Sequence, residues 1–328
     1  MFKKTWKQIK ILIALIIVLI CLPTSILPHR TQTDDKEEAD IYRKQNEAEK
    51  RLIEYKDNDE ALSLKLGQLE IINSSRKRNN APSVKLDILA SRVANRMSRE
   101  AAQNVFLGHW NMAGEEPYLR YAFAGGYDHV SENAYGEWST EKYSASSQLI
   151  SSMMKTGHQK FMAERAPDNG HKVNIIDKAH NYVGIGYFLE GKQFRYYEEF
   201  IDRYFEFENI PSEVKEGEKF NITLNTRNNG FLYFMIIYRE NFPQPLSPAE
   251  INKKGSYRDF TNQEYKTVTA WDLSRYRNGT LYQIPLSFPE EGLYYIQIYY
   301  DKKEITKPAP LNTAGKAPAS GIVIKVSR

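Results

Sequence analysis

Two histidines and one glutamate are the side chains of this sequence that could do chemistry. His109 and His171 each follow a glycine, and Glu132 lies in the short polar pattern SEN. Imidazole and carboxylate groups bind divalent metal ions and exchange protons near neutral pH. Because 62 positions separate the two histidines, spacing alone does not show that these groups meet. A hydrogen-bonded loop residue remains the simpler interpretation of each histidine taken singly.

Most other chemistry is excluded by composition and by absent motifs. The chain has 328 residues and no HExxH, GxSxG, Walker or dinucleotide-binding pattern. Its single cysteine, Cys21, excludes a disulfide scaffold, a Cys₄ zinc site and an iron–sulfur cluster. The net charge of 45 − 41 = +4 is too small to argue for nucleic acid. Ser131 neighbours Glu132, but no motif supports a catalytic triad around it.

The elements that must position these residues are predicted to be helices and a hairpin. Apolar residues at helical spacing predict helices over 84–102 and 145–155. Two apolar, aromatic runs on either side of Glu190-Gly-Lys192 predict a β-hairpin over 182–201. The glycine-rich stretch 108–127 is expected to be a loop. This mixture predicts an α+β domain that ends near residue 202.

Beyond Tyr204 the sequence changes to short β-rich runs separated by turn residues. They predict an antiparallel, immunoglobulin-like β-sandwich. The pattern SPAE at 247–250 predicts a short helix with a capping box. The many tyrosines are typical of strand pairing, and a carbohydrate- or protein-binding face is the alternative. The predicted strands are 205–210, 220–225, 231–239, 267–273, 282–288, 293–300 and 322–326.

The N-terminus has the pattern of an export signal. Four lysines precede the apolar run 11–22, which is shorter than the ~20 residues of a full membrane span. Residues 1–30 are therefore a cleaved signal peptide or a short membrane anchor. Apolar residues every seven positions from Ile41 to Leu69 predict one helix over about 36–72. That helix is either a stalk that associates with other copies through 34–60, or a solvated helix that leans on the next domain.

Five short patterns between residues 66 and 202 occur in a distinctive order. They are LEIINSSR at 69–76, the apolar helix at 86–97, HWNMAGEEPYLR at 109–120, GYDHVSENAYG at 126–136 and GHKVNIIDKAHNYVGIG at 170–186. In this order they resemble the CAP superfamily, which contains the SCP-like domains of cysteine-rich secretory, antigen 5 and pathogenesis-related proteins. The match covers about 40% of the chain, and the lack of cysteines in it fits the prokaryotic branch.

The resemblance implies an α/β/α sandwich with a cleft lined by two histidines and two glutamates. His109, Glu132 and His171 match three of these positions and form a plausible set of ligands for Zn²⁺ or another divalent metal. The fourth position falls near Thr156, where there is no acid, so Glu164 is the expected substitute.

Two further residues are possible occupants of the cleft. Glu137 is a second substitute for the missing glutamate, and His158 could also reach the cleft. An ordinary place at a helix end is the alternative for His158.

The sequence thus predicts four parts: an export segment (1–30), a charged stalk (31–65), a CAP domain (66–203) and a β-sandwich (204–328). We expect a secreted or cell-envelope protein that binds a small apolar molecule, a peptide or a metal in the cleft. The sandwich would bind an extracellular partner. The alternative is a metal-dependent, peptidase-like hydrolase with Glu132 as general base.

Overall fold

The structure is a computed structural model that describes residues 32–257 and 264–328. The predicted export segment and Cys21 lie outside the described residues. Residues Tyr42–Arg328 form one compact unit. Among the helices of the described ranges, none is both long and apolar enough to cross a bilayer.

A four-stranded sheet organises the first half of this unit. Its order is β1 (Lys85–Leu86), β3 (Tyr182–Glu190), β4 (Gln193–Asp202) and β2 (His129–Trp138). The predicted hairpin is confirmed as β3 and β4, which pair antiparallel. The residues around Glu132, for which no strand was predicted, form the edge strand β2. Both faces of β2 carry polar side chains, so the apolar alternation that indicates a strand is missing.

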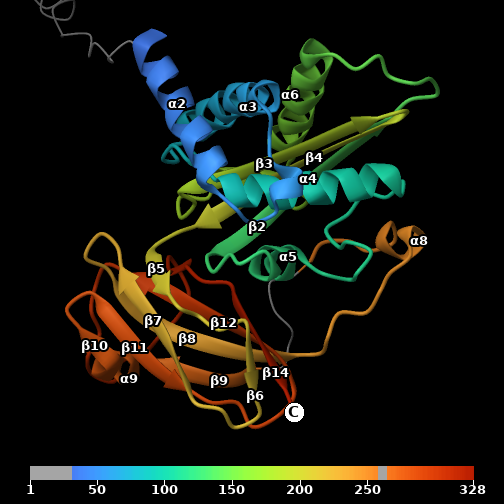
Figure 1. Cartoon of the computed structure of the whole chain (residues 1–328). Coiled ribbons are helices and arrows are strands. Elements are labelled where there is room, and N and C mark those ends of the chain that lie inside the picture. Colours follow the sequence, from blue (N-terminus) through green and yellow to red (C-terminus); the bar gives the residue numbers. More distant parts are fainter. Residues whose placement is uncertain (1–31, 258–263) are drawn as a thin grey trace, which may run out of the picture. The chain divides into compact units, whose positions relative to one another are not determined.

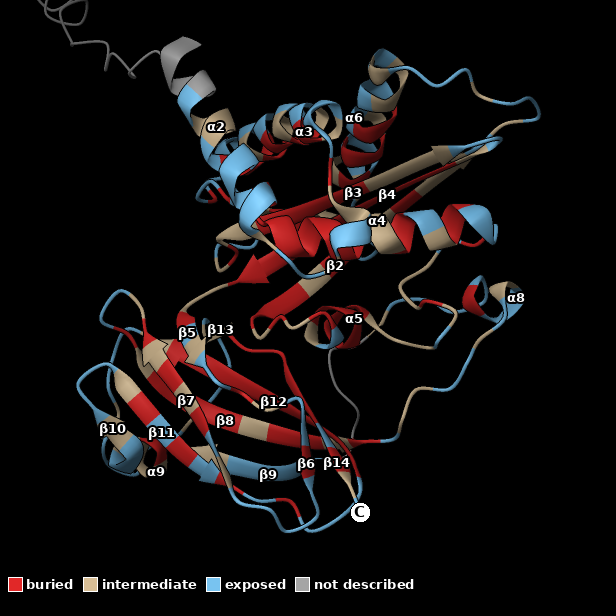
Figure 2. Ribbon diagram, viewed as in Figure 1, coloured by how far each residue is buried: buried red, intermediate tan, exposed pale blue. Residues whose placement is uncertain are grey.

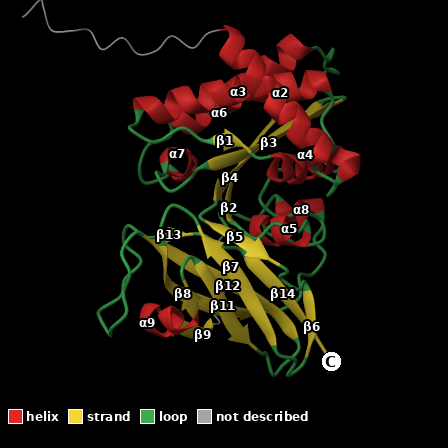
Figure 3. Cartoon of the chain, turned by 60° about the vertical axis from the view of Figure 1, so that its left-hand side comes forward, coloured by secondary structure: helices red, strands yellow, loops and turns green. Residues whose placement is uncertain are grey.

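Helices cover both faces of this sheet (Figures 1 and 3). On β4, Phe194 and Tyr196 pack with α3 (Asp59–Arg78) and α6 (Ser147–Ala163), whereas Tyr197 faces α4 (Ile88–Gln103). The alternation follows from the two-residue period of a strand. The result is an α/β/α arrangement, and the chain as a whole has the predicted α+β class.

Two short helices lie where the sequence indicated loops. Pro117–Phe123 form α5, which has proline in its first turn, and Gly170–Ile176 form α7. The predicted helix 84–102 begins later, at Ile88, because the Asp87 carboxylate caps it by accepting the Ala90 N–H at 2.7 Å.

The single long helix predicted over 36–72 is wrong. The chain forms α2 (Gln32–Ala48), a 3₁₀ turn η1 (Ile53–Tyr55) and then α3. The buried Arg92 guanidinium donates to the carbonyl oxygens of Asn46, Glu49 and Arg51, which holds the chain in a non-helical path. Of the apolar residues that recur every seven positions, Leu62 and Leu69 are buried in the chain's own core. Self-association through 34–60 stays a prediction.

The second half is a sandwich of two sheets. One has the order β10-β11-β7-β5, and the other has the order β6-β14-β12-β8-β9, with β13 paired to β12. The pairs are antiparallel except for β6 with β14. The bounds are β5 Phe205–Glu208, β6 Glu213–Lys215, β7 Phe220–Thr226, β8 Phe231–Glu240, β9 Glu264–Thr269, β10 Arg277–Asn278, β11 Leu281–Leu286, β12 Gly292–Asp301, β13 Ala317–Pro318 and β14 Ile322–Ser327.

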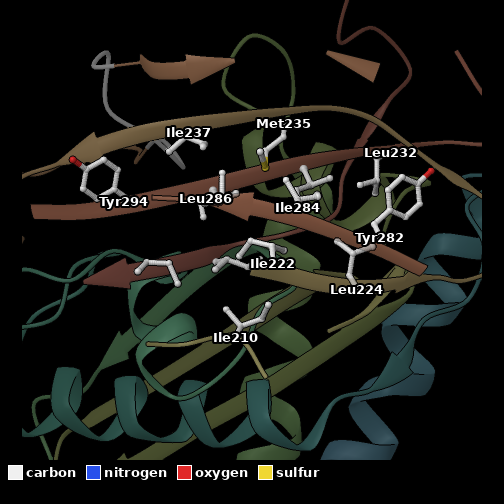
Figure 4. Packing of buried hydrophobic residues seen from close by; sticks show 14 of the residues in the cluster. Ile210, Ile222, Leu224, Leu232, Met235, Ile237, Tyr282, Ile284, Leu286 and Tyr294 are labelled. Carbon is white, nitrogen blue, oxygen red and sulfur yellow. The ribbon is translucent and has the colours of Figure 1, made fainter. Parts of the chain in front are cut away.

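Apolar side chains from both sheets form the sandwich core. Ile222 and Ile284 of one sheet face Met235 and Ile237 of the other (Figure 4). Strand β12 is buried along nearly its whole length (Figure 2). Of the predicted strand 267–273, residues 267–269 belong to β9, but residues 270–273 form the helix α9. The 3₁₀ turn η2 (Ser274–Tyr276) follows α9. The predicted capping box at Ser247 is confirmed by α8 (Pro248–Ile251).

Candidate functional site

A cavity of about 830 Å³ lies beside the edge strand β2. His109, Glu132, Glu164 and His171 all line it, although they come from a loop, a strand and the ends of two helices. The structure therefore brings together the four residues that the sequence singled out, and their role in binding stays a prediction. The other lining residues are Ser131, Asn133, Pro167, Asp168, Gly170, Asn174, Ser256 and Tyr257.

On one side of the cavity, His109 is paired with Glu132. The His109 Nδ1 lies 2.8 Å from Glu132 Oε1. The fully buried Arg120 donates to the other oxygen, Glu132 Oε2, and to the His109 carbonyl oxygen at 2.5 Å. Glu132 therefore joins the imidazole to the guanidinium, and both of its oxygens are occupied.

Burial keeps this histidine neutral. Burial lowers the pKa of His109 to about 4, and the positive charge of Arg120 acts in the same direction. Since the Glu132 carboxylate accepts a proton at Nδ1, the second nitrogen, Nε2, holds the lone pair. At neutral pH His109 is thus a ready metal ligand or hydrogen-bond acceptor.

A second carboxylate lies behind this pair. Glu199 of β4 is the register partner of Glu132 and is fully buried, with Oε1 at 3.7 Å from Arg120 Nη2. Burial, together with the charge of Glu132, raises the pKa of Glu199 well above its ordinary value. The single positive charge of Arg120 thus neutralises the Glu132 carboxylate, whereas the Glu199 carboxyl group keeps its proton. Sequence reasoning missed Glu199 because it stands in an apolar strand, and only the β2–β4 register reveals it.

On the other side of the cavity, His171 is paired with Glu164. Glu164 ends α6, and its Oε1 lies 2.5 Å from His171 Nδ1. Its Oε2 accepts the His171 backbone N–H at 3.1 Å, at the start of α7. The Phe161 ring packs against the imidazole with centroids 4.6 Å apart. Each cleft histidine thus has its own carboxylate partner.

The other two candidates lie elsewhere. Glu137 accepts the Tyr135 hydroxyl at 3.0 Å and does not line the cavity. His158 is buried between α6 and β4, bonded to Glu198 and Ser75.

The metal binding predicted from the sequence at His109, Glu132 and His171 stays a prediction. Among the described residues, no three His, Cys, Asp or Glu side chains are grouped to hold one ion. Both oxygens of Glu132 already take part in hydrogen bonds, with His109 and Arg120. The ring centroids of the two imidazoles are 6.4 Å apart, and no described residue bonds either Nε2.

Tyr257 closes one wall of the cavity and comes from the sandwich half. It lies in the connection between β8 and β9, and its hydroxyl accepts the Glu132 backbone N–H at 2.6 Å. Its ring is 4.7 Å from the His109 ring. No sequence signal could have found it, since 125 positions separate it from Glu132.

Comparisons with known proteins give partial likenesses. No family model and no curated protein matches the chain. It is similar to an extracellular protein containing an SCP domain from Bacillus anthracis (18% identity, TM-score 0.32), over 42% of this chain and 39% of that one. It is also similar to an outer surface protein from Borrelia burgdorferi (15%, TM-score 0.32), over 41% of this chain and 89% of that one. The chain is also similar to a superoxide reductase from Ignicoccus hospitalis (15% identity, TM-score 0.21), over 38% of this chain and 81% of that one.

Proposed function

We propose that this chain is an exported CAP-type protein whose cavity binds a divalent metal ion through His109 and His171, together with a polar ligand. One observation carries the proposal: each imidazole has its Nδ1 held by a carboxylate and its Nε2 unbonded within the described residues. A carboxylate at Nδ1 fixes the tautomer and the ring orientation and makes Nε2 a better metal ligand. The five ordered patterns support the family assignment.

The lining of the cavity favours a polar ligand over the small apolar molecule. Ser131, Asn133, Asp168, Asn174 and Ser256 add hydroxyl, amide and carboxylate groups to the two histidine–carboxylate pairs. An apolar molecule would bury the remaining hydrogen-bonding capacity of these groups at a cost in free energy, whereas a polar ligand can bond to them. A bound ion would supply positive charge to a carboxylate or carbonyl group of the ligand.

Binding is favoured over hydrolysis at this cavity. A general base needs a carboxylate oxygen that can reach a water molecule. Both oxygens of Glu132 are bonded to His109 and Arg120. Under the proposal Glu132 orients the imidazole, and the sandwich serves as the interaction module of an exported protein.

A zinc titration of the metal-free protein tests the proposal. We expect about one Zn²⁺ per chain, and the double variant His109→Ala/His171→Ala should lose at least 10-fold in affinity. The matched control is Asp168→Asn, which lines the same cavity outside both histidine pairs and should bind zinc nearly as the wild type does. Equal zinc binding by the wild type and the double variant would refute the proposal.

A further inference from the structure

A second cavity, of about 570 Å³, lies between α3 and α6. It shares no lining residue with the His109–His171 cavity. Ser75 and His158 form part of its wall, and both side chains are buried. Both polar side chains are hydrogen-bonded, as buried polar groups generally are.

Three side chains make a continuous hydrogen-bonded relay at this wall. Ser75 Oγ lies 2.9 Å from His158 Nε2, and His158 Nδ1 lies 2.8 Å from Glu198 Oε1. Glu198 is fixed in turn by the Tyr196 hydroxyl at 2.6 Å and by Asn133 Nδ2 at 3.1 Å. A serine, a histidine and a carboxylate in this order form the arrangement that activates a hydroxyl nucleophile.

The donors and acceptors fix the direction of each bond. The Glu198 carboxylate can only accept, so the His158 Nδ1 carries a proton and its Nε2 has the lone pair. Ser75 Oγ already accepts from Arg78 Nη2 at 3.1 Å. The hydroxyl proton is therefore directed at His158 Nε2, which is the direction that a general base requires.

A second serine–histidine–carboxylate set lacks this geometry. Ser131 Oγ is 3.5 Å from His180 Nε2, and it donates instead to Asn174 Oδ1 at 2.7 Å. The same amide oxygen lies 3.0 Å from His180 Nε2, so that nitrogen donates to it. The Asn174 amide group cannot be flipped to exchange its oxygen and nitrogen, because its Nδ2 donates to Asn133 Oδ1 at 3.0 Å. His180 thus has no lone pair for Ser131.

We propose that Ser75, His158 and Glu198 form an acyl-transfer site that hydrolyses carboxylic esters with a short apolar acyl group. Ile71, Met162 and Ala163 line the cavity and fit an apolar acyl group. Arg78 lies within hydrogen-bonding distance of the nucleophile and stabilises the oxyanion. The backbone amides around Ser75 bond along α3, so the side chain of Arg78 takes this role.

The reaction proceeds in two balanced halves. Ser75 Oγ bonds to the ester carbonyl carbon while its proton passes to His158 Nε2. The bond from that carbon to the alcohol oxygen breaks, and His158 gives the proton to the alcohol. Water then attacks the acylated serine, giving one proton to His158, which returns it to Ser75 as the carboxylic acid leaves.

The test uses the full chain in the presence of a chelator, so that a metal ion at the other cavity cannot contribute. The probes are p-nitrophenyl butyrate and a fluorophosphonate, and mass spectrometry locates the phosphonylated residue. We expect a label on Ser75, and ester hydrolysis that falls at least 100-fold in Ser75→Ala. The matched control is Ser152→Ala, at an exposed position of α6 outside the cavity lining, which should hydrolyse the ester within 2-fold of the wild type.

The location of the label in the wild type does not depend on whether any variant folds. A label on another residue, or no label together with hydrolysis no faster than in buffer, would overturn the proposal. Loss of hydrolysis in Ser152→Ala equal to that in Ser75→Ala would overturn it as well. Zinc binding is measured separately, so either proposal can fail while the other stands.

Discussion

Arg120 is the residue on which one side of the His109–His171 cavity depends. Its buried guanidinium bonds the Glu132 carboxylate and the carbonyl oxygens of His109 and Glu115. A buried carboxylate without a cation loses its proton only at a large cost in free energy. Arg120 therefore keeps Glu132 charged, and the charged carboxylate holds the His109 tautomer.

Asp202 gives a prediction about acid stability. Burial alone would raise its pKa, but His180 and His129, bonded at 2.7 and 2.8 Å, hold the pKa of Asp202 down at about 2. The pKa in the folded state thus lies below the ordinary value of 3.8. The resulting stability, on the order of 2 kcal/mol, is present above pH 4 and lost as the pH falls toward 2.

Urea unfolding of the wild type and Asp202→Asn between pH 2 and 6 measures this contribution. The difference between their free energies of unfolding should shrink by about 2 kcal/mol from pH 5 to pH 2. A difference that does not change with pH would show that this carboxylate is not held by the two histidines.

At the residue scale, the sequence singled out the cavity residues that stand in recognisable patterns. His109, Glu132 and His171 lie in motifs, and Glu164 was found by its distance from His171. Tyr257 and the Ser75–His158–Glu198 relay could not be predicted from the sequence, because the residues that bond one another come from separate elements. Ser75 is one of two adjacent serines on a helix, and nothing local distinguishes it from Ser74.

At the scale of elements, close packing of α4 on β3 depends on two glycines. A Cβ on Gly184 would lie 2.4 Å from the Ala90 carbonyl carbon, and one on Gly186 would lie 2.2 Å from that of Ala94. No side chain can be accommodated there unless the helix moves. This close approach explains why both glycines occur in the strand.

Two glycine substitutions should therefore have opposite effects. Gly186→Ala should lower the free energy of unfolding by about 1–3 kcal/mol or more, because the helix must shift. Gly67→Ala, at an exposed position of α3 with no atom within 4 Å, should raise it by about 0.5–1 kcal/mol. Denaturant unfolding of both variants checks the pair, and a stabilising Gly186→Ala would contradict the packing described.

Elements with regular apolar periodicity were predicted well. The hairpin β3–β4 and most sandwich strands lie within a few residues of their predicted positions. Strand β2 was missed because its side chains serve polar networks on both faces. The helix break at 49–58 was missed because Arg92, from another helix, causes it.

At the scale of the whole molecule, the sandwich half contributes a wall to the cavity of the other half. We call residues 241–257, between β8 and β9, the strap. The Ile251 side chain is fully buried against Met97 and Phe106, and Asn252 Oδ1 accepts the Leu107 N–H at 2.9 Å. These contacts fasten the strap whose last residue is Tyr257.

Ile251→Ala should loosen the strap. Removing this fully buried side chain is expected to lower the free energy of unfolding by about 2–5 kcal/mol. Limited proteolysis should then cleave within 241–257 faster than in the wild type. Unchanged cleavage and stability would mean that Ile251 does not fasten the strap. Asn241→Ala, at an exposed position of the strap, is the control.

Histidine NMR tests the central claim, that His109 and His171 share one ion, most directly. Long-range ¹H–¹⁵N spectra of the ¹⁵N-histidine-labelled chain report each ring nitrogen before and after Zn²⁺ is added. We predict that Nε2 of both His109 and His171 shifts to a metal-bound value at one equivalent, while each Nδ1 keeps its proton. A shift of only one of these rings, or of His158 or His180 instead, would contradict the account.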